Sequence, residues 1–257
     1  MYGYELARSD ECDIMKKVVN IIEKLLKLLP QSFQNTLYEM ILLHIPFWLL
    51  QLIPCSYSTY LKCYYPKPGD IVVDAGAHIG NCTIMFSRLV KGEGKVIAFE
   101  PFQESYTQLV DRIQRLGLTN VIALNKGLYC EDTELSFKVF SDTTLGANIA
   151  NEVEKDVLTE DITIVVVTLD TIVKQLNLPQ LHLVKMDIEG AEIEALDGAR
   201  QTMAHMAPCF AIASYHVRNR EKTCTAVEQR LAANGYEVNT FFPPHLTTCG
   251  HKVHNVQ

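Results

Sequence analysis

The chain has no apolar run long enough to cross a lipid bilayer. Its most apolar window, residues 40–54, is interrupted by a histidine, a proline and a glutamine, and a spanning helix needs roughly 20 apolar residues. The N-terminus has early acidic residues and no small-residue cleavage site after an apolar stretch, so no signal peptide is expected. These absences predict a cytoplasmic protein without a transmembrane helix.

Basic patches and paired cysteine motifs are also missing. No run of Lys and Arg interleaved with aromatic residues occurs, and the formal net charge is −7. Because phosphate binding needs a basic face, we expect no nucleic acid as the main partner. The eight cysteines include no C-x-x-C pair, and a chain of 257 residues can bury a core without disulfide staples. Reduced cysteines are therefore expected.

Internal repeats and low-complexity tracts are absent, and the length predicts one principal domain with an appendage. Residues 1–66 are predicted to be an N-terminal helical extension, because apolar residues recur at helical spacing from Val18 to Leu29. The extension is either a helical cap that walls a substrate site or an interfacial helix pair. In the second case residues 16–53 would make weak contact with a membrane surface or a lipid. The sequence leaves the oligomeric state open.

Residues 67–257 are predicted to be the main domain, because strand and helix patterns alternate from Pro68 onward as in an open α/β sheet. The expected strands cover residues 70–74, 95–99, 121–125, 182–187 and 209–214. The expected helices cover residues 80–90, 103–116, 191–204 and 221–234. Two β-like runs, at residues 135–140 and 162–168, are expected to form an insertion. A final antiparallel hairpin, made of residues 236–242 and 252–256, is expected to close the sheet.

Residues 72–81 have the order of a strand, a tight loop and a helix N-terminus. The apolar run ends on Asp74, passes through Gly76 and Gly80, and enters an amphipathic segment. The two glycines let the backbone approach a ligand closely, and the amides of the helix N-terminus point at it. Glu100 ends the next predicted strand, where an acid accepts hydrogen bonds from ribose hydroxyls. This pattern predicts a site for a nucleoside-bearing cofactor.

The glycine spacing distinguishes two classes of cofactor. The dinucleotide fingerprint G-x-G-x-x-G is absent, since residues 74–80 read DAGAHIG. An acid before the turn would repel a pyrophosphate, whereas it suits the amino-acid ammonium of S-adenosylmethionine. The electrostatics therefore favour S-adenosylmethionine over NAD. An NAD-dependent oxidoreductase and a non-catalytic cofactor-binding or interaction module remain as alternatives.

Polar residues also end the later predicted strands. Asp187 and Glu189 follow one strand and His216 follows the next, and ligands of such sheets bind beyond the carboxyl ends of the strands. The ordinary imidazole pKa of about 6.5 suits a general base. We therefore predict these three residues as catalytic, with the acceptor hydroxyl, the cofactor or a divalent ion as the partner of the acids. A third oxygen ligand is not evident, so no metal is predicted.

Three further groups of polar residues have simpler interpretations. Glu192 is expected to stabilise the N-terminus of the following helix. Arg218 and Arg220 would either meet an anionic acceptor or lie in a solvated loop. The histidines and the cysteine of the tail lack the paired spacing of a zinc site, so a polar terminal hairpin is expected there; they are His245, Cys249, His251 and His254.

Five short segments resemble, in order, the FkbM family of S-adenosylmethionine-dependent methyltransferases. They read VVDAGAHIGNCT (72–83), FEPF (99–102), VTLDTI (167–172), KMDIEGAE (185–192) and ASYH (213–216), within roughly residues 68–240. The resemblance implies an α/β, Rossmann-like class I methyltransferase fold with a seven-stranded, mostly parallel sheet and helices on both faces. It also implies O-methylation of a hydroxyl on a small-molecule acceptor, which would be a sugar, a lipid or a polyketide-like compound.

The resemblance also implies which residues hold the S-adenosylmethionine. The loop after the first strand would line its methionine part, and Glu100 would bind the ribose hydroxyls. The segment after the second strand would lie beside the adenosine, and the segment after the third would lie near the adenine. The candidate cofactor-binding residues are Asp74, Gly76, Ala77, His78, Gly80, Asn81, Thr83, Glu100, Pro101, Phe102, Asn125 and Leu128.

Overall fold

A seven-stranded sheet forms the centre of the chain in a computed structural model that describes residues 56–140, 159–218, 220–242 and 245–252. The strand order is β11-β12-β8-β7-β1-β2-β3, and β12 runs antiparallel to both of its neighbours. The strands are β1 (Ile71–Ala75), β2 (Lys95–Phe99), β3 (Val121–Leu124), β7 (Leu183–Met186), β8 (Cys209–Ala213), β11 (Glu237–Phe241) and β12 (Thr247–His251). This mostly parallel sheet confirms the predicted fold class.

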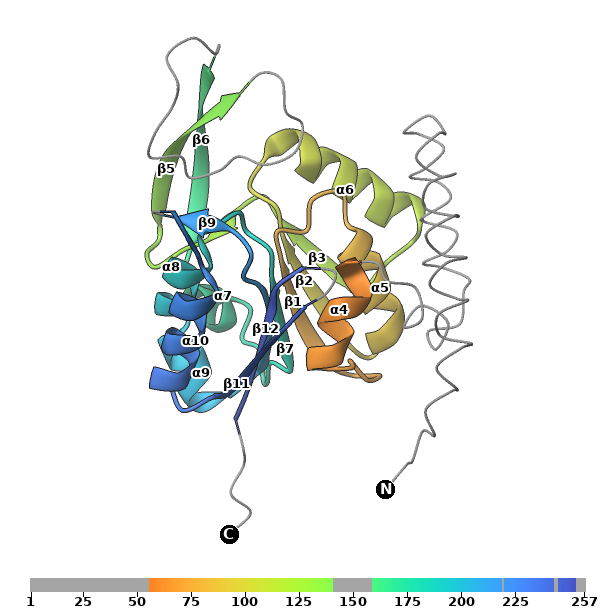
Figure 1. The fold of residues 1–257 in the computed structure, drawn as a ribbon. Helices are drawn as coiled ribbons and strands as arrows, with labels where there is room; N and C mark the ends of the chain where they lie inside the picture. The colour runs from red at the N-terminus through yellow and green to blue at the C-terminus, as the bar shows by residue number, and fades with distance from the viewer. Residues whose placement is uncertain (1–55, 141–158, 219, 243–244, 253–257) are drawn as a thin grey trace, which may run out of the picture.

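Helices cover both faces of the sheet, as Figure 1 shows. One face carries α4 (Ser56–Cys63), α5 (Asn81–Val90) and α6 (Gln103–Arg115). The other carries α7 (Leu169–Gln175), α8 (Glu192–Asp197), α9 (Arg200–His205) and α10 (Cys224–Ala233). Adjacent strand residues point to opposite faces, so Val72 belongs to the same apolar cluster as Phe86 of α5, while Val73 belongs to the same cluster as Leu196 of α8. The central strands are buried on both sides, which explains their continuous apolar runs.

The turn from β1 into α5 depends on two glycines with positive φ. Gly76 has φ +72°, and Gly80, which caps α5, has φ +91°. A β-carbon on Gly80 would lie 2.5 Å from Cδ1 of Leu109, so α6 packs closely against the loop. Only glycine fits both the backbone angle and this contact without strain. The loop is therefore held close to the sheet edge.

The predicted insertion forms a separate three-stranded sheet at the top of Figure 1. Its strands are β4 (Gly127–Leu128), β5 (Thr133–Phe140) and β6 (Thr159–Val167), in the order β4-β6-β5. β5 and β6 pair antiparallel, from Thr133 opposite Val166 to Phe140 opposite Thr159. Both runs expected to be strands are confirmed, although each begins a few residues earlier than predicted.

The C-terminal hairpin was predicted in part. β11 lies inside the expected range 236–242, but its partner is β12 at Thr247–His251 and not residues 252–256, of which 253–256 lie outside the described residues. β12 has few apolar side chains, yet its threonines are buried because it inserts between β8 and β11. Its position in the sheet, and not an apolar pattern, makes this segment a strand.

Two predicted helices also differ from the structure. The helix expected over 191–204 is divided into α8 and α9 at Gly198, where a β-carbon would collide with the main chain of Tyr129. The helix expected over 221–234 begins at Cys224, because residues 221–222 form β10 (Glu221–Lys222) and pair with β9 (Val217–Arg218). The first helix is therefore interrupted where it packs against Tyr129. The second starts later than expected because its first residues pair with the neighbouring strand β9.

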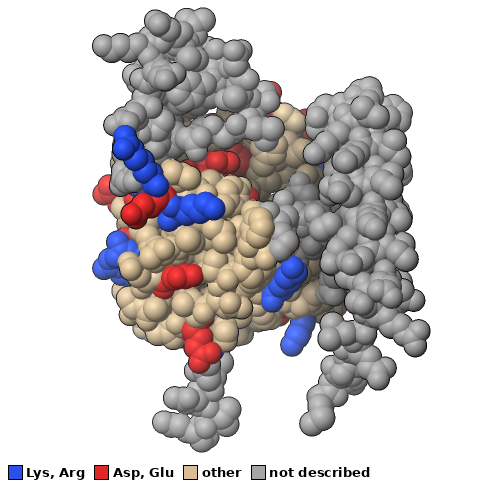
Figure 2. Space-filling view, in the orientation of Figure 1, with Lys and Arg blue, Asp and Glu red and all other residues tan. Residues whose placement is uncertain are grey.

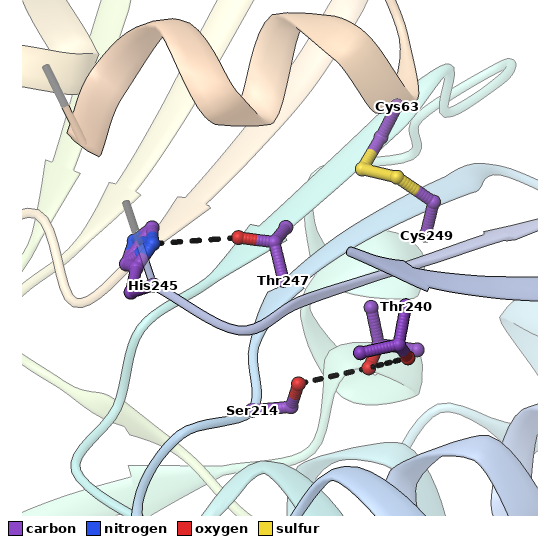
Figure 3. Close-up of a disulfide and its surroundings, with 7 residues drawn as sticks. Cys63, Ser214, Thr240, His245, Thr247 and Cys249 are labelled. Carbon is purple, nitrogen blue, oxygen red and sulfur yellow. Dashed lines mark hydrogen bonds between the residues drawn. A yellow bond between two sulfur atoms is a disulfide. The ribbon is translucent and has the colours of Figure 1, made fainter. Parts of the chain in front are cut away.

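A disulfide joins Cys63 of α4 to Cys249 of β12 (Figure 3). The expectation of reduced cysteines is therefore wrong for this pair. The physical reason is that α4 packs against β8 and β12, which brings the two Cα atoms to 5.2 Å although 186 residues separate them in the sequence. Cys12 and Cys55 lie outside the described residues. Among the other described cysteines, Cys130, Cys209 and Cys224 have free thiols.

The described part of the N-terminal extension, α4, is packed on the main sheet. Tyr60 and Leu61 are 1% and 5% exposed and join the core formed by α5 and the central strands. The predicted contact of residues 16–53 with a membrane or lipid lies outside the described residues. Among the helices that are described, none is long and apolar enough to span a bilayer.

On the face drawn in Figure 2, basic and acidic side chains are scattered and do not form one patch.

Candidate functional site

The candidate site lies where four neighbouring parallel strands end. Asp74 is near the end of β1, Glu100 follows β2, Asp187 follows β7, and Ser214 to His216 follow β8. Since β8, β7, β1 and β2 are adjacent in the sheet, these ends form one edge. Open parallel sheets bind their ligands at this edge. The structure therefore brings together the predicted catalytic residues and the predicted cofactor residues.

The glycine loop closes on itself and on the end of β2. The backbone N–H groups of Gly76 and Ala77 both donate to the carbonyl of Phe99, at 3.1 and 2.9 Å. The N–H of His78 donates to Oε2 of Glu100 at 2.7 Å, and His78 itself has a positive φ of +50°. Burial, with the charges of Lys185 and Arg112, lowers the pKa of His78. The loop is thus a rigid, hydrogen-bonded turn.

Glu100 is a buried carboxylate that two backbone N–H groups hold in place. It is only 4% exposed, and its second oxygen, Oε1, accepts the N–H of Phe102 at 3.1 Å. Burial raises the pKa of Glu100, although the two backbone N–H groups oppose that shift. Each carboxylate oxygen can accept a further hydrogen bond. Because the two N–H groups fix its orientation, this carboxylate fits the two hydroxyls of a ribose.

The charge of Asp74 is already paired inside the protein. Asp74 is fully buried, accepts the hydroxyl of Thr83 at 2.6 Å, and lies 3.0 Å from Nζ of Lys185. The same ammonium donates to the carbonyls of Ala75 and Gly76, at 3.0 and 2.8 Å. Although burial alone would lower the pKa of Lys185, Asp74 raises it. This ion pair ties β1, β7 and the glycine loop together.

The other predicted cofactor residues mainly support the loops around the site. Asn81 accepts a hydrogen bond from Arg112 at 3.0 Å. The amide of Asn125 donates to the main-chain carbonyls of Glu100 and Pro101, at 3.0 and 3.1 Å. Leu128 is 3% exposed and belongs to the apolar core. Pro101 and Phe102 are half-buried at the start of α6. Direct contacts of these side chains with adenosine stay predictions.

Asp187 is held by two tyrosines. Its Oδ2 accepts the hydroxyl of Tyr60 at 3.0 Å, and its Oδ1 accepts the hydroxyl of Tyr215 at 3.2 Å. The side chain remains 27% exposed. Burial and the negative charge of Asp187 raise the pKa of both tyrosines, so they stay protonated and donate. The carboxylate of Asp187 is therefore fixed in position at the end of β7.

His216 is the centre of a cluster of carboxylates. Its Nδ1 lies 3.1 Å from Oε1 of Glu192, and its Nε2 lies 3.5 Å from Asp187 and 3.6 Å from Glu189. Burial acts to lower the pKa of His216, but Glu192, Asp187 and Glu189 together raise it above the ordinary value. The three neighbouring acids therefore favour uptake of a proton by the imidazole ring.

Glu189 is the exposed acid of the cluster. Its backbone has φ +56°, an unusual conformation for a residue other than glycine, and its side chain is 42% exposed. Burial and the nearby charges of Asp187 and Glu192 raise its pKa, against the effect of His216. Such a backbone conformation costs of order 1–3 kcal/mol and is concentrated at functional sites. The turn after β7 presents this carboxylate toward solvent.

Glu192 holds this turn in place. It is fully buried, and its Oε1 accepts the N–H groups of Ile188 and Gly190 at 3.1 and 3.2 Å. The predicted role at a helix N-terminus thus includes hydrogen bonds to the preceding turn. Arg218 binds both oxygens of Glu194, at 2.8 and 2.7 Å, and the carbonyl of Gly190. Arg220 is exposed between β9 and β10.

Sequence reasoning missed Lys185, Tyr60, Tyr215 and His245. Tyr215 stacks between two histidines, with ring centroids 4.3 Å from His216 and 5.1 Å from His245. His245, which precedes β12, has its Nε2 3.4 Å from the hydroxyl of Tyr60. A lysine inside an apolar strand and a tyrosine beside His216 were usable signals. Tyr60 and His245 had none, because only the fold brings them to the site.

The remaining tail residues are placed separately. Cys249 is in the disulfide, and His251 lies 3.4 Å from Glu237 at the other end of the hairpin. His254 lies outside the described residues. Within the described part of the chain, no group of three or more histidine, cysteine or acidic side chains is arranged to hold a metal ion.

Comparison with known proteins supports one family. The model of the methyltransferase FkbM domain matches residues 74–238, and the model of protein-L-isoaspartate(D-aspartate) O-methyltransferase matches residues 8–130. Hexuronic acid methyltransferase AglP of Haloferax volcanii is 29% identical over 147 residues, which are 57% of this chain and 56% of that protein. Methyltransferase 1 of Beauveria bassiana is 28% identical over 156 residues, 53% of this chain and 62% of that protein. The chain thus spans between half and two thirds of these relatives.

Solved structures agree with the fold. Methyltransferase FkbM from Methylobacillus flagellatus has a TM-score of 0.52 at 19% identity, covering 79% of this chain and 52% of that one. A putative rRNA methylase from Clostridium thermocellum has a TM-score of 0.50 at 15% identity, covering 77% and 94%. These similarities concern the fold alone. The FkbM domain match, however, includes both the glycine loop and the His216 cluster, and this chain belongs to the FkbM family of S-adenosylmethionine-dependent methyltransferases.

Proposed function

We propose that this chain transfers a methyl group from S-adenosylmethionine to a hydroxyl of a small molecule, namely a sugar. The observation that carries the proposal is the juxtaposition of two half-sites at one sheet edge. Glu100 and the glycine loop follow β2 and β1, while Asp187, Glu189 and His216 follow β7 and β8. A donor held on the first half-site would therefore meet an acceptor held on the second.

The cofactor half-site would bind the donor through main chain and one carboxylate. Glu100 would accept hydrogen bonds from the ribose hydroxyls, and the turn at Gly76 and Gly80 would let the amino-acid part approach the backbone. S-adenosylmethionine would supply a methyl group on a positively charged sulfur. Because Lys185 already pairs with Asp74, we assign Asp74 to the shape of the loop rather than to an ammonium contact.

The acceptor half-site would position the hydroxyl and remove its proton. Asp187, fixed by its two tyrosines, would accept a hydrogen bond from the acceptor. Glu189 and His216 lie 3.6 Å apart, and the pKa of each is raised by its surroundings, which favours proton uptake by this pair. General-base catalysis contributes about 10²–10⁴ in rate, and positioning contributes roughly 7–11 kcal/mol of barrier reduction. We expect His216→Asn to lower kcat by about 10²-fold or more without weakening cofactor binding.

Titration calorimetry with S-adenosylhomocysteine and with NAD tests the cofactor. Saturable binding of S-adenosylhomocysteine alone would support the proposal, whereas preference for NAD would support an oxidoreductase. A transfer assay with labelled S-adenosylmethionine and a panel of hydroxylated acceptors then tests catalysis. Binding of the cofactor without any methylated product would support the third alternative, a non-catalytic module.

A sugar acceptor is supported by two observations. One curated relative carries the name hexuronic acid methyltransferase. The acceptor half-site itself combines carboxylates, which accept hydrogen bonds from several hydroxyls, with the ring of Tyr215. Ligand sites commonly join a few placed polar groups to aromatic surface. A lipid or polyketide-like acceptor with hydroxyl groups would use the same carboxylates.

A further inference from the structure

Two basic side chains next to the acceptor half-site, those of Lys185 and Arg218, are already engaged with acids. Lys185 is 3% exposed and is bound to Asp74 and two carbonyls. Nη1 of Arg218 contacts both oxygens of Glu194 and the carbonyl of Gly190. Breaking a buried ion pair such as Lys185–Asp74 is costly, and Arg218 would have to give up these three contacts. Neither residue is available to neutralise a negatively charged acceptor.

The acids of the half-site, in contrast, are only partly neutralised. Even when protonated, His216 supplies only one positive charge to a cluster of three acids, Asp187, Glu189 and Glu192. Lys185 also interacts with Asp187 and Glu189, but its charge is paired with Asp74. Glu192 is fully buried and lies nearest to the ring, while Asp187 and Glu189 are 27% and 42% exposed. The two carboxylates that an acceptor can reach therefore retain net negative charge.

His216 also has a polar atom that is not satisfied within the described protein. Its side chain is 5% exposed, and its Nε2 makes no hydrogen bond there, because Asp187 and Glu189 are 3.5 and 3.6 Å away. A buried polar nitrogen without a partner costs free energy. Its position between the two exposed acids indicates that a ligand oxygen completes this arrangement.

The side of the cluster formed by Tyr215 and His245 is aromatic and uncharged. The rings of Tyr215 and His245 are nearly parallel, at 27° and 5.1 Å between centroids. Burial lowers the pKa of His245, and His216 acts in the same direction while Asp187 opposes it. Tyr60 and Tyr215 lie against the His245 ring as neutral phenols, because the pKa of each is raised. A flat, neutral surface beside two acids suits a ring with hydroxyl groups and no negative charge.

We infer that the acceptor is an uncharged or cationic hydroxylated ring, such as a neutral or amino sugar, and that the site discriminates against acidic sugars. In this respect the chain would differ from its relative AglP, whose name specifies a hexuronic acid. The inference rests on the proposed function and specifies its acceptor. In the transfer step, the acceptor oxygen forms the new bond to the methyl carbon, the carbon–sulfur bond breaks with its electron pair left on sulfur, and the hydroxyl proton passes to the Glu189–His216 pair. An acceptor carboxylate would add a negative charge beside this pair.

The expected discrimination follows from Coulomb's law. A like charge about 6 Å from one carboxylate, at an effective dielectric constant of about 20, lowers affinity about 100-fold. Solvent screening of a half-exposed acid reduces this effect. We therefore expect an acidic sugar to bind about 10- to 100-fold more weakly than its neutral counterpart.

The test uses three probes that share one ring, namely methyl glucoside, methyl glucosaminide and methyl glucuronide. Binding to the full chain loaded with S-adenosylhomocysteine is measured by NMR at the side chains of Tyr215, His216 and His245, and kcat/KM is measured for any probe that is methylated. We expect the glucoside and the glucosaminide to bind at least tenfold more tightly than the glucuronide. Equal or tighter binding of the glucuronide would overturn the inference.

Two variants show whether the cluster causes the discrimination. Glu189→Gln removes one exposed negative charge and is expected to reduce the glucoside-to-glucuronide affinity ratio at least about threefold. Glu237→Gln, an exposed acid at the far end of the β11–β12 hairpin, is the matched control and should leave the ratio unchanged.

Failure of this inference differs from failure of the proposed function. If the protein does not bind S-adenosylhomocysteine, the proposed function itself is wrong. If it binds S-adenosylhomocysteine but none of the three probes perturbs Tyr215, His216 or His245, the ring acceptor is refuted while the cofactor assignment stands. If Glu189→Gln leaves the glucoside-to-glucuronide affinity ratio unchanged, the charge of the cluster does not cause the discrimination and the inference is refuted.

Discussion

The disulfide between Cys63 and Cys249 should contribute strongly to stability, and replacing Cys249 with serine tests this. The bond joins residues 186 positions apart, and the loop-entropy expression gives about 5 kcal/mol for a closed loop of that length. Measured effects are commonly smaller, so we expect the free energy of unfolding to fall by about 2–5 kcal/mol. Its loss also frees α4, whose Tyr60 binds Asp187.

Urea unfolding followed by circular dichroism, with and without reductant, measures this contribution. Reductant should lower the free energy of unfolding of the wild type. The free energy of unfolding of Cys249→Ser should be the same with and without reductant. Cys130→Ser is the matched control, because Cys130 is an exposed free thiol and its loss should change little. Mass spectrometry of non-reduced peptides should show the linked pair.

Two results would refute this reasoning. The first is an unfolding midpoint of the wild type that reductant does not move, which would mean that the bond adds no stability. The second is a Cys249→Ser protein as stable as the oxidised wild type. If Cys249→Ser is destabilised but keeps its full methyl transfer rate, the disulfide stabilises the fold without positioning Tyr60.

Three further substitutions test the cofactor half-site. Gly76→Ala should destabilise the protein by at least about 2 kcal/mol in thermal unfolding, because its β-carbon would collide with the main chain after β7. Gly117→Ala is the control and should cost less, because Gly117 also has a positive φ but has open space around it. Asp74→Asn should cost about 3–5 kcal/mol in urea unfolding because it leaves Lys185 buried without its acid, and a smaller loss would mean that water reaches the pair. Glu100→Gln should weaken binding of S-adenosylhomocysteine by about tenfold or more in calorimetry, since charged hydrogen bonds contribute about 1.5–3 kcal/mol, and unchanged affinity would remove Glu100 from the ribose site.

Local sequence determined the elements that hold the cofactor half-site. The apolar run before Asp74 predicted a buried strand, and the glycines after it permit the positive φ values that the turn requires. Glu100 was predictable for the same reason, because it ends the next apolar run. These features depend on neighbouring residues, whose periodicity and backbone preferences are visible in the sequence.

Position along the chain also predicted the meeting of Asp187 and His216. Parallel strands of one sheet end at one edge, so residues that follow them lie together once the sheet order is known. The exact environment was not predictable. That Lys185 neutralises Asp74, and that Glu192 rather than Asp187 lies nearest to the ring of His216, depends on side-chain packing across strands.

The sequence by itself thus determined the sheet, the glycine loop and the acids at the strand ends, since each follows from spacing within a single element. Only the tertiary structure decided that Tyr60 and His245, 185 residues apart, meet beside Asp187, and that Cys63 reaches Cys249. The physical reason is that these contacts arise when α4 and β12 pack against the same strand, β8. Short-range periodicity reports which face of an element is buried, and it contains no information about which distant element covers that face.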